Sequence, residues 1–415
     1  MTTLQQQGAA AKAASYPLST AGTALKNAAL EAIAAVLTQR QDEWLAANAA
    51  DVAAAREAGM RPAMLDRLTL TPERIAGIVD GVRQIISLPD PIGRVDKMET
   101  RPNGLIIGRR RVPLGVIAII FEARPNVTVD AAALCLKSGN VCILRGGKEA
   151  IRSNRCAVEL MRAALRQAGL PEDCISLVQD TSHETAAELM HLDQYVDVLI
   201  PRGGAGLIRT VARESSVPVI RTGEGVCHIY VDPEADLDMA AEILYNAKCS
   251  RPSVCNAVEC VLVHRDVAGA FWEKALPLLD KHSVELRADA AALKILGGRA
   301  VPAAESDWDA EYDDYILAVR TVESLEEAIG FINAHGTGHS EAIVTRNYFS
   351  AQHFLDAVDA AAVYVNASTR FTDGGEFGLG AEIGISTQKM HARGPMGLEE
   401  LTSGKYVIYG QGQVR

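Results

Sequence analysis

The residue best suited to chemistry in this 415-residue sequence is Cys255, which lies in the segment Ser250–His264. The second half, Ala257–His264, is apolar and rich in β-branched residues, which predicts a buried strand. The first half contains Pro252, which is unfavourable in a helix interior or a central strand, so Cys255 is expected on a loop that leads into a strand. A thiol on such a loop can be exposed, and a cation such as Arg251 can lower its pKa, as a nucleophilic thiolate requires.

Cys255 has competitors, because the sequence contains eight cysteines and free cysteine is among the residue types most often buried. A small apolar filler is therefore the alternative to a nucleophile. No Cys-x-x-Cys motif and no Cys/His pattern of zinc-finger spacing occurs, so no metal site is expected. Reduced thiols are typical of a reducing, cytoplasmic compartment. The other cysteines lie at positions 135, 142, 156, 174, 227, 249 and 260.

The charge balance limits the class of partner. The chain has 41 Lys and Arg against 52 Asp and Glu, a formal net charge of −11, which argues against nucleic acid or an anionic membrane as the main partner. The N-terminal sequence does not have the pattern of a signal peptide, and no apolar run of about 18 residues occurs, so no membrane span is expected. A small anionic substrate is compatible with this charge, because a local cluster of arginines can oppose the global sign.

Two glycine-containing turns, each after a predicted strand, are suited to phosphate. One reads Arg145-Gly-Gly-Lys148, and the other includes Gly203 and Gly204. Glycine permits close approach of the backbone, and the helix that follows offers unpaired N–H groups. Neither turn matches the dinucleotide pattern G-x-G-x-x-G or the P-loop pattern, and an ordinary tight turn is the alternative for each. Two such turns in one sheet favour a nucleotide-binding site.

The order of predicted elements indicates an α/β protein of about two or three domains. An Ala-rich stretch at 20–58 predicts an amphipathic helix, and Val95–Pro113 predicts a two-stranded hairpin with an Asn-Gly turn. From Leu114, and again after Gly223, short apolar strands alternate with helices, so two doubly wound parallel sheets are expected. The strands predicted in the first series are Gly115–Phe121, Asn140–Leu144, Ser176–Val178, Val196–Ile200 and Val217–Ile220, and a last strand is predicted in Leu401–Gln411.

Three segments of the sequence resemble a known family. They are Phe121–Asn126 (FEARPN), Lys137–Gly147 (KSGNVCILRGG) and Ser250–Asn256 (SRPSVCN). Together they resemble the γ-glutamyl phosphate reductases, or glutamate-5-semialdehyde dehydrogenases, of the aldehyde dehydrogenase superfamily, and the resemblance covers nearly the whole chain. It implies NADPH-dependent reduction of L-glutamyl 5-phosphate to L-glutamate 5-semialdehyde with release of phosphate, in proline biosynthesis.

The resemblance also implies an organisation. An aldehyde dehydrogenase-like fold would have two doubly wound α/β domains and a small β oligomerisation flap. The NADP-binding domain would comprise 1–94 and 114–222, and the catalytic domain 223–395. The hairpin 95–113 and the tail 396–415 would form a contact in a homodimer or homotetramer. A functional association with glutamate 5-kinase is implied as well.

Individual residues acquire roles from the same resemblance. Cys255 matches the thiol nucleophile, and Arg145 matches a basic residue that contacts the adenosine ribose. Lys148 lies where NAD-preferring members often have Glu, and a cation there favours the 2′-phosphate of NADP. Gly203 and Gly204 match the turn at the pyrophosphate. Glu311 matches the Glu that holds the nicotinamide ribose, and Gly378 falls near the substrate-side loop.

The sequence departs from the hydrolytic members of the superfamily at two places. Their Glu base lies 34 residues before the nucleophile, where this sequence has Arg221, which cannot activate water. Their Trp-Asn pair is missing around Phe121–Asn126, which leaves Asn126 and the Cys255 N–H as candidates to stabilise an oxyanion. Neither departure obstructs attack of the thiolate on an acyl phosphate followed by hydride transfer, since no water-activating base is needed.

Three arginines beside the motifs, Arg124, Arg221 and Arg251, are candidates to bind the carboxylate and phosphate of the substrate, because guanidinium groups bind oxyanions in bidentate fashion. Two other functions stay open. One is oxidation of a semialdehyde with NAD(P) and water by another member of the superfamily. The other is a non-catalytic oligomeric protein that binds the dinucleotide only as a ligand.

Overall fold

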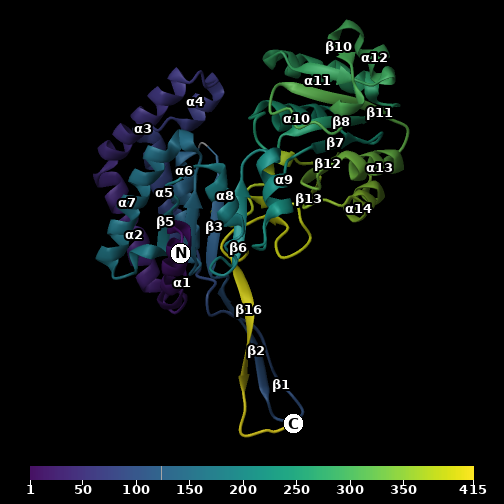
Figure 1. Cartoon of the computed structure of the whole chain (residues 1–415). Coiled ribbons are helices and arrows are strands. Elements are labelled where there is room, and N and C mark those ends of the chain that lie inside the picture. The colour runs from purple at the N-terminus through teal and green to yellow at the C-terminus, as the bar shows by residue number, and fades with distance from the viewer. Residues whose placement is uncertain (123) are drawn as a thin grey trace. The chain divides into compact units, whose positions relative to one another are not determined.

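The structure, a computed structural model, describes residues 1–122 and 124–415 (Figure 1). Residue 123, within the motif Phe121–Asn126, lies outside the described residues. The chain packs into two compact units. The first comprises Met1–Thr222, Gly378–Gly384 and Met396–Arg415, and the second comprises Gly223–Phe377 and Ile385–Pro395.

The contacts of Gly378–Gly384 differ from the domain boundaries expected from the sequence. This segment packs with the first unit, although it falls within the range 223–395. Within this segment Gly380 has a φ of +76°, which favours glycine, and its backbone packs closely against the side chain of Leu88 in the first unit. The hairpin 95–113 and the tail 396–415 also pack as parts of the first unit.

The first unit contains a parallel sheet with the strand order β5-β4-β3-β6. The strands are β3 (Val116–Phe121), β4 (Val141–Arg145), β5 (Ile175–Leu177) and β6 (Val198–Arg202), and the helices between and after them are α6 (Pro125–Lys137), α7 (Ile151–Ala168), α8 (His183–Met190) and α9 (Ala205–Glu214). All residues of β3 are buried, as expected for a parallel strand covered on both faces. The predicted strand Val217–Ile220 was wrong, because only Val219 pairs there, in a single bridge to Leu199.

Five helices precede this sheet: α1 (Thr3–Ser19), α2 (Thr23–Gln39), α3 (Gln41–Glu57), α4 (Pro62–Leu68) and α5 (Pro72–Ser87). The helical stretch predicted at 20–58 is divided at Arg40, which ends α2 and precedes α3. The sequence did not predict α1. Its start is fixed by Thr2, whose side chain accepts a hydrogen bond from the N–H of Gln5 in a capping box.

The predicted hairpin is confirmed as β1 (Val95–Thr100) and β2 (Ile106–Pro113), which pair antiparallel. The predicted last strand is β16 (Thr402–Tyr409), and it pairs antiparallel with the other edge of β2. Figure 1 shows β1, β2 and β16 side by side, with β16 in yellow beside the blue hairpin. We call this three-stranded sheet the flap.

The second unit is built on a seven-stranded parallel sheet with the order β10-β9-β11-β8-β7-β12-β13. Alternate residues of β7 face opposite sides: Ile229 and Val231 pack in one apolar cluster, and Tyr230 packs in another. The sheet is therefore covered on both faces, as a doubly wound fold requires. Its strands are β7 (Cys227–Val231), β8 (Val258–His264), β9 (Glu285–Ala288), β10 (Ala300–Pro302), β11 (Ile316–Val322), β12 (Ser340–Val344) and β13 (Ala362–Val365). Its helices are α10 (Leu237–Cys249), α11 (Ala268–Leu279), α12 (Ala290–Leu296), α13 (Leu325–His335) and α14 (Tyr348–Ala357), and two short strands, β14 (Ile385–Ser386) and β15 (Gly394–Pro395), pair with each other.

Candidate active site

Cys255 lies on the loop between α10 and β8, which confirms the loop-before-strand prediction. At the start of the loop, Ser250 Oγ donates to the carbonyl of Asn246 at 2.6 Å, so the loop leaves the last turn of α10 in a fixed direction. At its end the chain enters β8, in which every residue is buried. Cys255 itself is half-buried. Rigid elements therefore position a thiol that is still partly accessible. We call Ser250–Asn256 the nucleophile loop.

Exposure separates the eight cysteines. Among the described residues six are buried and two, Cys156 and Cys255, are half-buried, and none forms a disulfide. Burial raises the pKa of the Cys156 thiol, and the carboxylates of Glu43 and Glu159 raise it further, so this thiol stays protonated. Cys255 is therefore the cysteine best placed to act as a nucleophile.

The main chain of Cys255 is held from behind by β7 and the residues before it. A Cβ at Gly225 would overlap the carbonyl group of Cys255, so only glycine fits there. The Gly225 N–H donates to Glu311 Oε1 at 2.9 Å, and burial raises the pKa of Glu311. The thiol of Cys227 donates to the Cys255 carbonyl at 3.2 Å. Glu311, expected from the resemblance to hold the nicotinamide ribose, thus contacts the residue that supports the nucleophile.

Asn256 ties the nucleophile loop to the short helix η6 (Thr369–Phe371). Its Nδ2 donates to the carbonyl of Arg370 at 3.2 Å. The Arg370 guanidinium in turn donates from Nη1 to Asn256 Oδ1 and from Nε to Ser250 Oγ, the latter at 3.1 Å. Arg370 is a functional residue that the sequence pattern did not predict, because its local signal is a single basic residue in the segment Ser368–Asp373 between β13 and the glycine-rich tail.

Cys255 interacts electrostatically with the guanidinium of Arg370. His339 is buried, and burial lowers its pKa to about 4, so its ring is neutral. Its Nδ1 lies 3.8 Å from Cys227 Sγ and 2.8 Å from Ser340 Oγ. Burial and the charge of Arg251 lower the pKa of Arg370, whereas Cys255 and Asp373 raise it, which places two cations within electrostatic range of the nucleophile loop.

The predicted cations for the cofactor follow β4 in the first unit. Arg145 Nη2 donates to the carbonyls of Thr181 and Ser182 at 2.7 and 3.2 Å. Its Nε is buried without a hydrogen-bond partner among the described residues, and burial lowers its pKa. Lys148 begins the short helix η1 (Lys148–Ala150) and is exposed. An orphaned buried N–H beside an exposed ammonium fits a polyanionic ligand.

The second predicted phosphate turn contains an anion of the chain itself. The N–H of Gly204, at the start of α9, donates to Glu122 Oε2 at 3.2 Å. A Cβ at Gly203 would lie 2.6 Å from Glu122 Cδ, so glycine is required for this approach. The carboxylate lies at the positive end of the helix, where an anion is stabilised.

The other predicted site residues are divided between the units. Asn126 is in the first turn of α6 and its Nδ2 donates to Asp130 Oδ2 at 3.0 Å. Burial raises the pKa of Asp130 to about 6. Gly378 has a φ of +75°, which favours glycine. The first unit contains Arg124, Asn126, Arg221 and Gly378, and the second unit contains Arg251.

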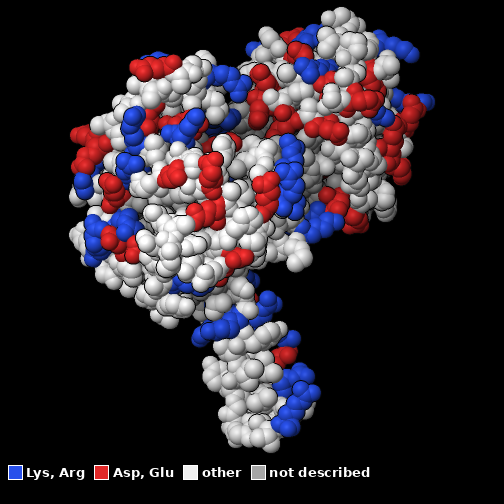
Figure 2. Space-filling view, in the orientation of Figure 1, with Lys and Arg blue, Asp and Glu red and all other residues white. Residues whose placement is uncertain are grey.

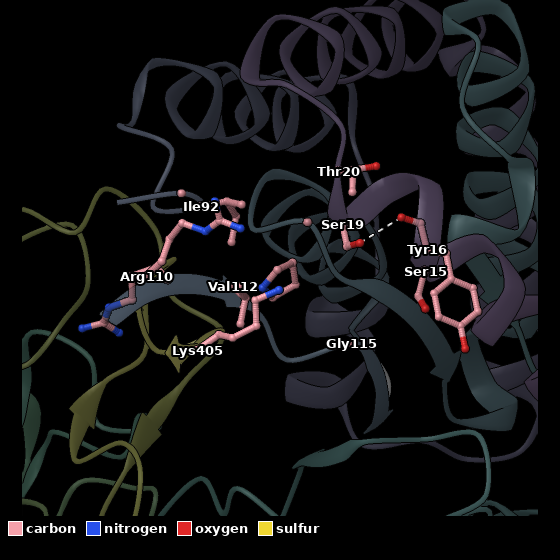
Figure 3. Close-up of a pocket in the computed structure, with 13 residues that line it drawn as sticks. Ser15, Tyr16, Ser19, Thr20, Ile92, Arg110, Val112, Gly115 and Lys405 are labelled. Carbon is pink, nitrogen blue, oxygen red and sulfur yellow. Dashed lines mark hydrogen bonds between the residues drawn. The ribbon is translucent and has the colours of Figure 1, made fainter. Parts of the chain in front are cut away.

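A cavity of 410 Å³ lies between the C-terminal end of α1 and the base of the flap (Figure 3). Arg110 and Lys405 are directly opposite each other on β2 and β16 and both line it. Neither forms an ion pair with any residue that the structure describes. On the other wall, Ser19 Oγ donates to the Tyr16 carbonyl at 2.8 Å, the bond drawn in Figure 3. The cavity therefore carries uncompensated positive charge.

Charges of both signs are interspersed over the face shown in Figure 2. Among the described residues, no helix combines the length and apolar character needed to cross a membrane. Within the same residues, no cluster of three or more His, Cys, Asp or Glu side chains is arranged to hold a metal ion.

Comparison with known proteins places this site in a family. The model of the aldehyde dehydrogenase family matches residues 2–292 and 311–407. The chain belongs to the aldehyde dehydrogenase family. The aldehyde dehydrogenase-like fold expected from the sequence is thereby confirmed.

Within the aldehyde dehydrogenases, curated relatives agree on one activity name. The chain is 58% identical to a gamma-glutamyl phosphate reductase of Enterococcus faecalis over 415 residues, covering 100% of this chain and 99% of the relative. It is 57% identical to a protein of the same name from Halothermothrix orenii, covering 99% and 98% of the two chains. The expected resemblance to this group is therefore confirmed.

Solved structures of aldehyde dehydrogenases show the same relationship. The crystal structure of a gamma-glutamyl phosphate reductase from Thermotoga maritima has a TM-score of 0.98 and 46% identity, with complete coverage of both chains. An acetylating aldehyde dehydrogenase from Geobacillus thermoglucosidasius has a TM-score of 0.72 at 17% identity, covering 99% and 97% of the two chains, and shares the fold.

Proposed function

We propose that this protein reduces L-glutamyl 5-phosphate to L-glutamate 5-semialdehyde with NADPH and releases phosphate, as a step of proline biosynthesis. The observation that carries the proposal is a half-buried Cys255 on a loop bordered by arginines, in a chain that matches gamma-glutamyl phosphate reductases along its whole length. The bacterial relatives and the eight cysteines, which form no disulfide among the described residues, support a cytoplasmic location.

The proposed chemistry begins at Cys255. Its thiolate attacks the acyl carbon, a carbon–sulfur bond forms, and the bond to the phosphate oxygen breaks with the electron pair leaving on phosphate. The N–H of Cys255 and the side chain of Asn126 are the proposed donors to the oxyanion. When NADPH is bound, it supplies the hydride that reduces the thioester. Collapse of the thiohemiacetal then returns the sulfur as thiolate and releases the aldehyde.

Hydrolysis of the thioester is disfavoured because position 221 is occupied by Arg, which cannot act as a base toward water. The purified protein, given semialdehyde and NADP, should therefore reduce NADP only when inorganic phosphate is present. Equal rates with and without phosphate would overturn the proposal in favour of a hydrolytic semialdehyde dehydrogenase.

The cofactor is proposed to be NADPH, bound through Arg145, Lys148, Gly203, Gly204 and Glu311. The exposed ammonium of Lys148 and the orphaned Nε of Arg145 support a ligand that carries an additional phosphate. At the Gly203-Gly204 turn, the hydrogen bond from the Gly204 N–H to the carboxylate of Glu122 supports an anion at the N-terminus of α9. A pyrophosphate at this turn would compete with that carboxylate.

Lys148→Glu tests the choice of cofactor. A carboxylate at this position repels the 2′-phosphate of NADPH and leaves NADH unaffected, so the ratio of kcat/KM for NADPH over NADH should fall about tenfold or more. Steady-state kinetics with both cofactors measures the ratio. Lys294→Glu, a charge reversal at an exposed position of α12, is the matched control and should leave the ratio unchanged. An unaltered ratio in Lys148→Glu would contradict the assignment.

The substrate anions are proposed to bind to Arg124, Arg221 and Arg251, with Gly378 in the substrate-side loop. Arg251 has the clearest support, because it lies on the nucleophile loop and is exposed. Acyl phosphates react readily with water, so direct transfer from glutamate 5-kinase, which forms them, is part of the proposal. Co-sedimentation of the two purified proteins tests this association.

The protein is proposed to form a homodimer or homotetramer through the flap. β1 and β16 are its edge strands, and Met98, Tyr406 and Ile408 are exposed on them. Edge strands with exposed apolar side chains favour pairing with another chain. Acidic groups of a partner would also neutralise Arg110 and Lys405. A monomer by light scattering at micromolar concentration would contradict this proposal.

A further inference from the structure

Arg370 differs from the arginines expected to bind substrate because its side chain is hydrogen-bonded to the nucleophile loop. Its guanidinium donates to Ser250 Oγ and to Asn256 Oδ1, which belong to the first and last residues of the nucleophile loop. Arg370 therefore spans the loop that carries Cys255. Both acceptors are neutral, so these hydrogen bonds fix the position of the guanidinium without neutralising its charge.

One further guanidinium and one carboxylate act on Arg370, besides the thiol of Cys255 itself. Arg251, on the same loop, forms no ion pair with any residue the structure describes, and its charge acts on Arg370. The carboxylate that acts on Arg370 is Asp373, and it accepts hydrogen bonds from the N–H groups of Gly375 and Glu376, at 2.8 and 3.4 Å. The exposed guanidinium of Arg251 repels the half-buried guanidinium of Arg370, and a bound anion relieves that repulsion.

The guanidinium of Arg370 also has donors to offer. An arginine has five N–H groups, and the two described hydrogen bonds use two of them. The remaining donors lie on the planar fork that binds phosphate in bidentate fashion. Because Arg370 is held at both ends of the nucleophile loop, these donors are fixed relative to Cys255.

We propose that Arg370, together with Arg251, forms the subsite for the phosphate group that leaves the substrate. This inference rests on the proposed function and adds to it the residues that bind one part of the substrate. The phosphate oxygen is bonded to the carbon that Cys255 attacks, whereas the α-carboxylate is at the other end of the glutamyl chain. An arginine bonded to both ends of the nucleophile loop lies at the reacting end.

Arg370 assists the departure of phosphate during attack by the Cys255 thiolate. The carbon–sulfur bond forms while the carbon–oxygen bond to phosphate breaks, and the leaving phosphate takes the electron pair as additional negative charge. The hydrogen bonds from Arg370 and Arg251 strengthen as that charge develops, so they stabilise the transition state more than the substrate.

The reverse reaction separates phosphate from the rest of the substrate, because semialdehyde and inorganic phosphate are then two different reactants. In Arg370→Gln and in Arg251→Gln, KM for phosphate should rise about tenfold or more, while KM for semialdehyde stays within about twofold. Arg251→Gln removes a charge but none of the hydrogen bonds described for the loop residues, so it tests anion binding separately from loop structure. Arg370→Lys, which keeps the charge but loses the fork, should recover part of the phosphate affinity. Arg346→Gln is the control, because that exposed side chain pairs with Asp236.

A second measurement does not depend on turnover. Inorganic phosphate should protect Cys255 of the native protein from iodoacetamide, and should protect it much less in Arg370→Gln and Arg251→Gln. Protection that is equal in all three proteins would overturn the subsite. So would a rise of KM for semialdehyde alone, which would assign the arginines to the α-carboxylate, or a fall in kcat with neither KM altered. Phosphate-independent turnover with intact protection would overturn the proposed function and leave the anion subsite standing.

Discussion

Cys255→Ser should reduce NADPH-dependent turnover by about a thousandfold or more and leave NADPH binding unchanged. Serine keeps the shape of the side chain, but its hydroxyl is protonated at neutral pH and is a far weaker nucleophile than a thiolate. The neighbouring His339 has a pKa of about 4 and is buried beside Cys227. Without a thiolate no thioester forms, and hydride has no acceptor. Steady-state rates and fluorescence titration with NADPH measure the two quantities.

Cys156→Ser is the matched control, because Cys156 is the other half-buried cysteine among the described residues. Its turnover should equal that of the native protein. Iodoacetamide should label Cys255 and abolish activity at the same rate, while Cys156, whose pKa burial raises, reacts slowly. Near-normal turnover in Cys255→Ser would refute the nucleophile and revive the alternative of a protein that binds the dinucleotide without catalysis.

The sequence was sufficient for elements whose signal is local. Strands such as β3 and β8 are short, apolar and bounded by loop residues, and their burial on both faces makes the pattern plain. The strands β9 and β10 were missed, because β9 includes Glu285 and Arg287 and both strands have exposed positions at one side of the sheet. These two strands are determined by pairing with neighbouring strands of the sheet, and not by an apolar run in the sequence.

The candidate site was predicted only where its residues are close in sequence. Arg251 was found because it lies four positions before Cys255 in the same segment. Arg370 was missed because it reaches the nucleophile loop from 114 residues beyond Asn256, through the order of strands in the sheet. No composition or spacing rule brings these positions together. Likewise, the glycine turn at Gly203 was recognised, but the carboxylate of Glu122 within it was not.

Gly225→Ala should reduce kcat by on the order of a hundredfold, because the added methyl group would overlap the carbonyl of Cys255. The two backbone segments must separate to admit it. That movement displaces the carbonyl that accepts the Cys227 thiol, and it lengthens the hydrogen bond from Gly225 N–H to Glu311. The thiol of Cys255 then moves with its own backbone. Kinetics, together with the rate of Cys255 alkylation by iodoacetamide, measures the displacement.

The control for Gly225→Ala is Gly330→Ala, at an exposed position of α13 where a Cβ meets no atom within 4 Å. Alanine favours a helix by about 1 kcal/mol over glycine, so this variant should unfold at the same or a higher temperature and retain full activity. A general loss of stability in Gly225→Ala would lower the amount of folded protein but not the kcat of the folded fraction, whereas a displaced nucleophile lowers kcat itself. Active-site titration by alkylation distinguishes the two. Native kcat per reactive thiol in Gly225→Ala would show that the contact with Gly225 does not position Cys255.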